Sequence, residues 1–540
     1  MQKAARFSTT HRWLLPLILI LIGTTIPQST AISLSNVIQP ALLQVVDNAP
    51  DSIISLIVQQ KTRDETLAKS IALLEGKVTK DLPIINAFAA ELPARQVVKL
   101  ARDARVRWIS LDAPVVDTKC EQCVNASISA NNYNSSIRAD LVWNEEPHFQ
   151  GQNITVAVVD SGIKKTHADF SGRVLQSVNI AYPDFLFDGY GHGTYVAGII
   201  AGDGSRSAGA YMGIAPKANL LDVRVTSFAG AATESDVVAG LQWIYDHRAD
   251  YNIRIVNLSF NASLPQSYHT SPLNAACEML WFNGVVVVAA AGNHGMDAIY
   301  PPANDPFIIT VGAVDDRGTA SIADDEIASF SAYGTTADGT SKPDLVAPGR
   351  NLVGPLNDKY GLLALLHPKN VLQNNTYLRM SGTSAAAPVV TGAVALLLQA
   401  EPQLTPDQVK YRLLATANKT WNGYDPVKAG AGYLDIYAAI HSNTLESANI
   451  GLPVSSLITT DSFVTQPSNE ITLDSIKWSS IKWSSVTWST LSWNSIYWEN
   501  ETEMARMNDH INDSTDVTAE ASREPAVTHI FLPVITTDMP

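Results

Sequence analysis

The sequence predicts an α/β protein whose main domain is a three-layer αβα sandwich on a mainly parallel sheet, preceded by a small α+β domain. Between residues 140 and 442, short β-branched runs alternate with helical stretches. These runs are continuously apolar, as is typical of strands buried on both faces. Residues 52–115 instead show a compact β-α-β-α-β order. With 540 residues, the chain has room for about three or four domains.

The small domain precedes the main one, and its first predicted helix places Leu67, Ile71 and Leu74 on one face. Its predicted strands are 52–60, 82–93 and 106–115, and its predicted helices are 62–78 and 94–106. This order suits a small sheet with two helices on one face. Residues 116–140 are rich in Asn, Ser and Asp, and we expect an exposed linker there.

The main domain contains five strand-like runs and four helical stretches. The predicted strands are 154–160, 218–225, 253–260, 284–293 and 307–314, and the predicted helices are 193–202, 233–249, 271–282 and 384–400. Strands that alternate with helices in this way predict a parallel sheet between two helix layers. In such sheets, active sites lie at the carboxyl ends of the strands.

The first 31 residues have the pattern of a secretory signal. Lys3, Arg6 and Arg12 precede an apolar run at 14–23, which is short for a membrane span. Small residues follow and offer a cleavage point near residue 31. We therefore expect a secreted protein, and the alternative is an uncleaved N-terminal anchor.

The overall composition favours a folded and acidic protein. Hydrophobic residues make up 46% of the chain, charged residues 16%, and the formal net charge is −15. This charge argues against nucleic acid as a partner, because phosphates require a basic surface. Cys120 and Cys123 form a C-x-x-C whose redox state stays open, whereas Cys277 lies in an apolar helical stretch and is expected to be buried.

The C-terminal part differs in character from the main domain. Residues 443–475 read as a linker, and residues 499–540 as a largely disordered acidic tail. Between them, residues 476–498 repeat every five residues and place a tryptophan in each repeat, at Trp478, Trp483, Trp488, Trp493 and Trp498. Five such repeats are few for a stable unit of their own. We therefore expect the segment either to dock on a partner or to remain loosely ordered. The candidate partners are carbohydrate, a membrane interface, the cell envelope, which would retain the protein at the cell surface, and the catalytic domain.

Three local patterns carry the candidate chemistry. A strand-like run ends at Asp160, His192 lies between two glycines at the start of a predicted helix, and Ser384 begins a helix of small residues. The positive end of that helix faces whatever Ser384 attacks. Each residue also has a structural interpretation, which is a turn-capping aspartate, an ordinary histidine and a helix-capping serine.

Taken in order, D-S-G at 160–162, G-H-G-T at 191–194 and S-G-T-S-A-A-A-P at 381–388 resemble the signature blocks of the subtilisin-like serine peptidases. The resemblance covers about residues 140–442. It extends to A-A-A-G-N, which ends at Asn293, and to H-x-D-F and K-P-D-L-V-A-P-G, which begin at residues 167 and 342.

This resemblance implies the roles of the site residues. Asp160, His192 and Ser384 would be the catalytic triad of a serine endopeptidase, and Asn293 the side-chain donor to the oxyanion. The substrate-binding strand would comprise Leu258, Ser259, Phe260 and Asn261, and this chain has Asn261 where the family usually has glycine. The chemistry would require no cofactor. The resemblance allows a structural calcium ion, but the sequence assigns no metal ligands.

The resemblance also predicts a self-processed zymogen. Residues 32–118, with a core at 52–115, resemble the family's inhibitory propeptide, which would act as an intramolecular inhibitor. Residues 119–139 would be the processing linker and 140–442 the peptidase domain, with proteins or peptides as substrates. The alternative is a binding protein on a peptidase fold without activity, but all four catalytic positions are intact.

Overall fold

The computed structural model describes residues 37–458, except for 63, 83–85, 113, 118–130, 182–186, 264–265 and 297–298. All described residues belong to one compact unit, Leu34–Pro540. The predicted signal peptide, both cysteines of the C-x-x-C, the tryptophan repeat and the acidic tail lie outside the described residues.

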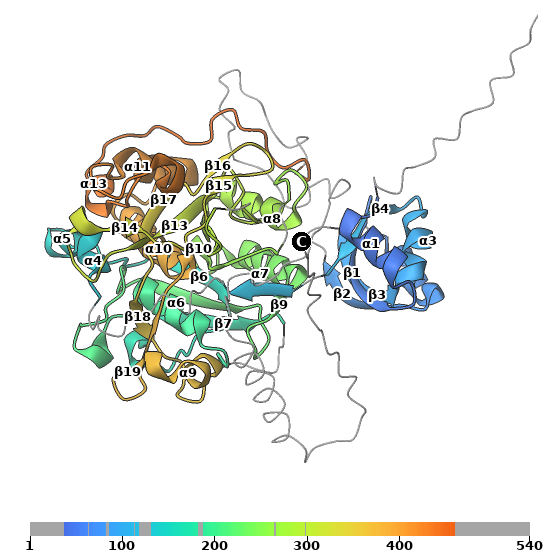
Figure 1. Ribbon diagram of the computed structural model, residues 1–540, viewed down its shortest axis with the longest axis horizontal. Helices are drawn as coiled ribbons and strands as arrows, with labels where there is room; N and C mark the ends of the chain where they lie inside the picture. Colours follow the sequence, from blue (N-terminus) through green and yellow to red (C-terminus); the bar gives the residue numbers. More distant parts are fainter. Residues whose placement is uncertain are drawn as a thin grey trace, which may run out of the picture. The chain divides into compact units, whose positions relative to one another are not determined.

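The main domain is built on an eight-stranded sheet with the strand order β14-β13-β12-β10-β6-β8-β7, in which β17 pairs with β13 (Figure 1). Its strands are β6 (Thr155–Asp160), β7 (Val174–Asn179), β8 (Asn219–Arg224), β10 (Ile253–Leu258), β12 (Val286–Ala290), β13 (Ile309–Asp315), β14 (Glu326–Ile327) and β17 (Leu345–Pro348). Every pairing in this sheet is parallel except that of β13 with β14. The predicted, mainly parallel sheet is therefore confirmed.

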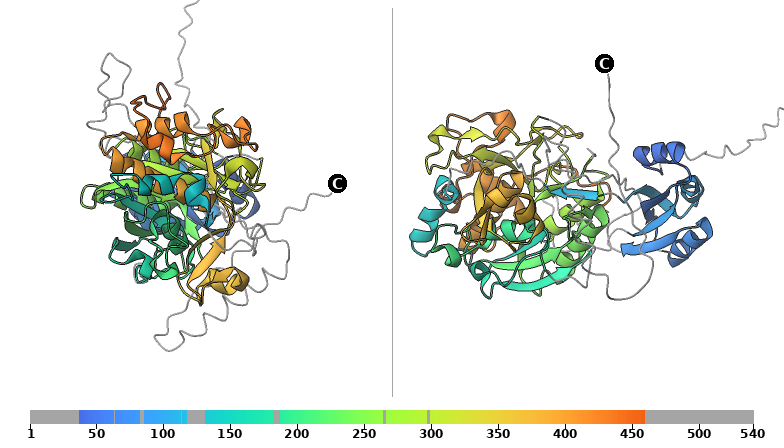
Figure 2. Two further views of the ribbon diagram at one scale, coloured as in Figure 1. Left: turned by 90° about the vertical axis from the view of Figure 1, so that its left-hand side faces the viewer. Right: turned by 60° about the horizontal axis from the view of Figure 1, so that its bottom comes forward.

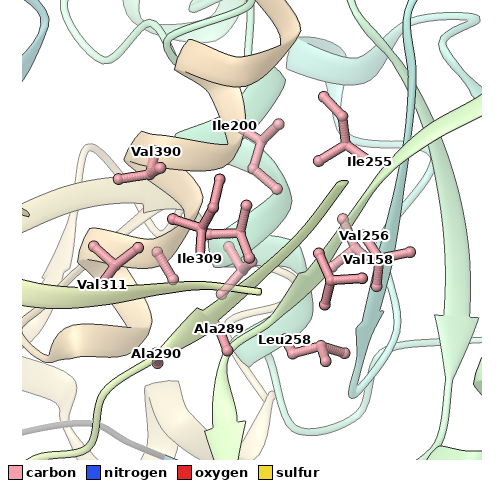
Figure 3. Close-up of a cluster of buried hydrophobic side chains, with 14 of the residues drawn as sticks. Val158, Ile200, Ile255, Val256, Leu258, Ala289, Ala290, Ile309, Val311 and Val390 are labelled. Carbon is pink, nitrogen blue, oxygen red and sulfur yellow. The ribbon is translucent and has the colours of Figure 1, made fainter. Parts of the chain in front are cut away.

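Helices cover both faces of this sheet, and Figure 2 shows the arrangement from two further directions. The helices α6 (His192–Ala201) and α10 (Thr383–Ala400) pack together on one face, whereas α7 (Glu234–His247) and α8 (Pro272–Trp281) pack together and contact β6 and β12. Figure 3 shows Ile200 of α6 and Val390 of α10 among the side chains of the central strands. The three-layer αβα prediction is confirmed.

Two apolar features of these helices have structural roles. Among the described helices, α10 alone is long and apolar enough to cross a membrane by length and composition, but 89% of the tested stretch is buried inside the fold. Cys277 of α8 is a free, fully buried cysteine, and burial raises the pKa of its thiol well above the usual range. The expectation of a small buried hydrophobic residue at this position is confirmed.

Shorter elements complete the main domain. The strands are β9 (Ala232–Thr233), β11 (Phe260–Asn261), β15 (Gly334–Thr335), β16 (Ser341–Lys342), β18 (Leu352–Pro355), β19 (Val371–Leu372) and β20 (Tyr377–Met380). The helices are α4 (Tyr133–Ser136), α5 (Ala139–Asn144), α9 (Leu362–Leu366), α11 (Pro406–Thr416), α12 (Pro426–Ala429) and α13 (Ile436–Ile440). The strand β20 pairs with β18 and β19 and leads directly into α10.

We call residues 37–117 the N-terminal domain; its core is a four-stranded sheet in the order β2-β3-β1-β4. The elements are α1 (Pro40–Asn48), β1 (Ile53–Gln60), α2 (Glu65–Ser70), β2 (Lys77–Leu82), β3 (Ala87–Pro93), α3 (Val97–Ala101), β4 (Val106–Leu111) and β5 (Pro114–Asp117). The predicted β-α-β-α-β order is incomplete, because β2 is an additional strand. It pairs with β3 as a hairpin, and all three pairings in this sheet are antiparallel.

Two segments that were predicted as linkers are partly folded onto the main domain. Within 119–139, Tyr133 is buried in α4, and Asn131 exchanges hydrogen bonds with the backbone of Val353 at 2.7 and 2.8 Å. Within 443–475, the Ser455 N–H donates to the buried carboxyl of Glu278 at 2.9 Å. The exposed linker expected at 116–140 is therefore partly buried in its described part, and the linker predicted at 443–475 has at least one hydrogen bond to a buried carboxyl of the main domain.

Candidate active site

Asp160 and His192 lie together at the carboxyl edge of the sheet. Asp160 is the last residue of β6, and His192 is the first residue of α6; both side chains are buried. The Nδ1 atom of His192 lies 2.9 Å from each carboxylate oxygen of Asp160. Because a carboxylate only accepts hydrogen bonds, the proton of this bond lies on Nδ1 and leaves Nε2 as the basic nitrogen of the neutral ring.

Glycine at position 193 makes this approach of α6 to β6 sterically feasible. A Cβ atom there would lie 2.2 Å from the carbonyl oxygen of Gly162 and 3.1 Å from Cβ of Asp160. Gly191, which precedes His192, has a φ of +106°, a conformation that side-chain-bearing residues rarely adopt. The two glycines of G-H-G-T thus allow the histidine to approach the aspartate closely.

Asp188 organises the loop between the two residues and was missed by the sequence analysis. Its Oδ1 accepts hydrogen bonds from Ser161 Oγ at 2.9 Å and Gly191 N at 2.7 Å, and its Oδ2 accepts from Thr194 N and Oγ1 at 3.0 and 2.6 Å. Burial raises the pKa of Asp188, and these hydrogen bonds counteract the rise. In the sequence, the only indication of this role is that a carboxylate residue stands four positions before His192.

Ser384 and Asn293 meet at the N-terminus of α10. Ser384 is the second residue of this helix and is fully buried. The Oδ1 atom of Asn293 accepts hydrogen bonds from Thr383 N at 2.8 Å and Thr383 Oγ1 at 3.0 Å. With its oxygen held in this way, the amide offers its nitrogen as a donor beside the start of the helix. The helix itself contributes a positive end there.

The four predicted substrate-binding residues separate into two groups. Leu258 ends β10, and Figure 3 shows it among the core side chains. Ser259 Oγ donates to the carbonyl oxygen of Ser384 at 3.1 Å, which ties this segment to α10. Phe260 and Asn261 form β11, a strand that already has a partner.

That partner is the end of the N-terminal domain. The strand β5 lies between β11 and β9, so that these three strands form a small sheet of their own. Both pairings are antiparallel, with Asp117 opposite Phe260 and Pro114 opposite Thr233. Main-chain pairing of this kind is how an extended peptide adds to an exposed strand edge.

No metal centre is evident in the described part of the chain. No group of three or more His, Cys, Asp or Glu side chains there is arranged to hold an ion. A serine hydroxyl and a histidine paired with a carboxylate are side chains suited to nucleophilic and acid–base chemistry.

The chain is similar to proteins of a known family. Residues 151–433 match the family model described as the subtilase family. Serine protease AprX of Bacillus subtilis is 40% identical over 295 residues, which cover 52% of this chain and 65% of AprX. Subtilisin NAT of Bacillus subtilis subsp. natto is 31% identical over 368 residues, which cover 67% of this chain and 83% of that protein.

A solved structure is similar as well. The crystal structure of fervidolysin from Fervidobacterium pennivorans, described as a keratinolytic enzyme related to subtilisin, matches with a TM-score of 0.59 and 26% sequence identity. The match covers 76% of this chain and 63% of fervidolysin. This chain thus spans slightly less than two thirds of both AprX and fervidolysin.

Proposed function

Because this chain belongs to the subtilase family of serine peptidases, we propose that it is a secreted serine endopeptidase made as a self-processed zymogen. The observation that carries this proposal is the buried Asp160–His192 hydrogen bond, at the sheet edge where the helix of Ser384 begins. Peptide hydrolysis would proceed through an acyl-enzyme on Ser384.

In the first step, Ser384 Oγ attacks the peptide carbonyl while His192 Nε2 accepts its proton. The same nitrogen then returns the proton to the leaving amine, and a water molecule repeats the sequence on the acyl-enzyme. Asp160 keeps the proton on Nδ1 and stabilises the imidazolium that forms. Asn293 Nδ2 and the Ser384 N–H stabilise the negative oxygen of the tetrahedral intermediate.

Replacing Asn293 by alanine is expected to lower kcat by about 10²–10³-fold, the loss that one oxyanion donor accounts for in subtilisin. The donor acts on charge that develops only in the transition state, so KM should change little. Steady-state kinetics on a fluorogenic peptide measures both constants. A rise in KM at constant kcat would instead make Asn293 an ordinary substrate contact.

The N-terminal domain supports the zymogen part of the proposal through β5. The antiparallel register pairs Asp117 with Phe260, and the side chain of Ser259, the residue before Phe260, donates a hydrogen bond to the carbonyl oxygen of Ser384. A peptide strand that kept this register beyond the position opposite Phe260 would lie opposite Ser259, beside the start of α10. We therefore infer self-cleavage shortly after Asp117, next to the predicted linker 119–139, with the N-terminal domain as the intramolecular inhibitor.

Charged groups join the N-terminal domain to the start of α7. Ser235 Oγ donates to Asp112 Oδ1 at 3.0 Å, and Lys80 forms an ion pair with Asp236. Burial, reinforced by the charge of Asp236, raises the pKa of Asp112 to about 7. An acid with a raised pKa stabilises the folded precursor while it is protonated. That contribution is lost as the pH rises from the ordinary aspartate value of 3.8 to about 7.

The Asp112→Asn variant is expected to remove this pH dependence. In a Ser384→Ala background, which keeps the precursor intact, the native carboxyl should lose about 1.4 kcal/mol of stabilisation per pH unit across that interval. The amide does not ionise, so the variant should become relatively more stable at pH 8 than at pH 5. Urea unfolding of both proteins measures the difference. If the difference in the free energy of unfolding between the two proteins stayed constant with pH, the raised pKa of Asp112 would be contradicted.

Secretion and surface retention are proposed on the sequence alone. The pattern at 1–31 supports export, and the tryptophan repeat supports contact with either the cell envelope or the catalytic domain. Deleting residues 470–500 separates the two contacts. Loss of solubility identifies a cover for the catalytic domain, whereas loss of surface retention identifies an envelope contact.

The proposed function is tested by casein hydrolysis and intact mass on the secreted wild-type protein. We expect hydrolysis together with a chain that has lost its N-terminal domain. A protein that hydrolyses neither casein nor its own precursor would support the non-catalytic alternative.

A further inference from the structure

Asn261 has an unusual place in the proposed substrate cleft. It is only 4% exposed, and its backbone pairs with the segment that β5 supplies. Its Nδ2 donates to the carbonyl oxygen of Ala290 at 2.8 Å. Ala290 is the last residue of β12, three residues before Asn293. The side chain of Asn261 therefore links β11, the strand that pairs with an added peptide, to the end of β12, which leads to the proposed oxyanion donor Asn293.

The register shows which substrate residue meets this side chain. If a bound peptide keeps the register that β5 shows, its residue opposite Ser259 is two residues beyond the one opposite Asn261. Ser259 itself donates a hydrogen bond to the carbonyl oxygen of Ser384, so we place the attacked carbonyl at the residue opposite Ser259. Side chains two residues apart on a strand share one face. Diagonal neighbours on one face of an antiparallel pair lie within reach of each other. The residue whose carbonyl is attacked therefore places its side chain beside the carboxamide of Asn261.

The carboxamide limits both the size and the chemistry of that side chain. Its hydrogen bond to Ala290 holds the carboxamide between β11 and the end of β12, and a glycine at this position would have no side chain there. Its Oδ1 is buried and receives no hydrogen bond from any described residue. A buried acceptor without a donor is unfavourable, so a ligand that donates a hydrogen bond gains affinity there. Serine and threonine meet both conditions, because their side chains are small and their hydroxyl groups donate hydrogen bonds.

We propose that Asn261 directs cleavage to sites after a small, hydroxyl-bearing residue, serine or threonine. This inference rests on the proposed function, because it names the substrate class of the same cleft. The chain's own sequence is compatible with it: Asp117, the last residue of β5, is followed by Thr118. Thr118 lies outside the described residues.

The test uses quenched fluorescent peptides that differ only in the residue before the scissile bond, with threonine, serine, leucine or phenylalanine. The wild-type protein is compared with Asn261→Gly, which removes the carboxamide. Asn252→Gly is the matched control, because Asn252 is exposed and has a φ of +50°, which glycine adopts readily.

We expect the wild-type protein and the control to favour threonine and serine over phenylalanine by about tenfold or more in kcat/KM. The Asn261→Gly variant should raise kcat/KM for phenylalanine and leucine by a similar factor and lower it for threonine. A wild-type preference for phenylalanine, or a ratio that Asn261→Gly leaves unchanged, overturns the inference while casein hydrolysis persists. Loss of all hydrolysis by the wild type would instead remove the proposed function itself. If the Asn261→Gly variant is not secreted, the inference is decided by the wild-type protein alone, through its ratio of kcat/KM for threonine and serine to that for phenylalanine.

Discussion

The Ser384→Ala variant is expected to be secreted as an unprocessed precursor with kcat lowered by about 10⁶-fold, the loss that removal of the nucleophile causes in subtilisin. Alanine has no oxygen with which to form an acyl-enzyme, so cleavage of casein and self-cleavage should disappear together. Oxyanion stabilisation and substrate binding remain and account for the small residual rate. Casein hydrolysis and intact mass measure the two losses in one preparation.

The matched control for this experiment is Ser171→Ala. Ser171 is exposed, and its Oγ donates to the carbonyl oxygen of Ala168 at 2.8 Å, a contact within its own turn. This variant should keep wild-type activity and a shortened chain. If Ser384→Ala matched it in both respects, another residue would be the nucleophile.

The Asp160→Asn variant should lower kcat by about 10⁴-fold, the loss that the equivalent change causes in a trypsin-like triad. An amide in place of the carboxylate can donate to Nδ1, which moves the ring proton to Nε2 and removes the base that the proposed mechanism requires there. The fold should persist, because the substitution keeps the size of the side chain. Steady-state kinetics and a melting curve distinguish the two effects. A melting temperature that falls in parallel with activity would make Asp160 structural instead.

The elements that the sequence predicted correctly are those with a strong local signal. The strands β6, β8, β10, β12 and β13 are rich in apolar residues and almost wholly buried, because both of their faces are covered. The three motifs of the site lie at the ends of such elements. The glycine and proline residues near Asp160, His192 and Ser384 are local patterns, so the sequence alone indicates these three residues as candidates.

The missed elements have weak local patterns. The strand β7 lies at the edge of the sheet and is largely half-buried or exposed, so it carries no continuous apolar run. The strand β2, with the sequence KVTKDL, is mostly exposed and is stable only as the partner of β3. In both strands, tertiary pairing determines the conformation rather than residue propensity.

The contributions of Asp188 and Asn261 could not be predicted from local sequence. Asp188 acts through four hydrogen bonds to residues on two segments, and this arrangement exists only after β6 and α6 have packed together. The effect of Asn261 depends on its distance to Ala290, which lies 29 residues away in the chain. The family resemblance drew attention to Asn261 but did not show what its side chain contacts.

The most direct test of the central claim is to label the nucleophile. The secreted wild-type protein is treated with a fluorophosphonate, digested and mapped by mass spectrometry, with His192→Ala as the comparison. We predict a single phosphonyl group on Ser384, loss of casein hydrolysis in step with labelling, and little labelling of the variant, because His192 activates the serine. A label on another serine that tracks the loss of activity, or full activity after complete labelling of Ser384, would contradict the account.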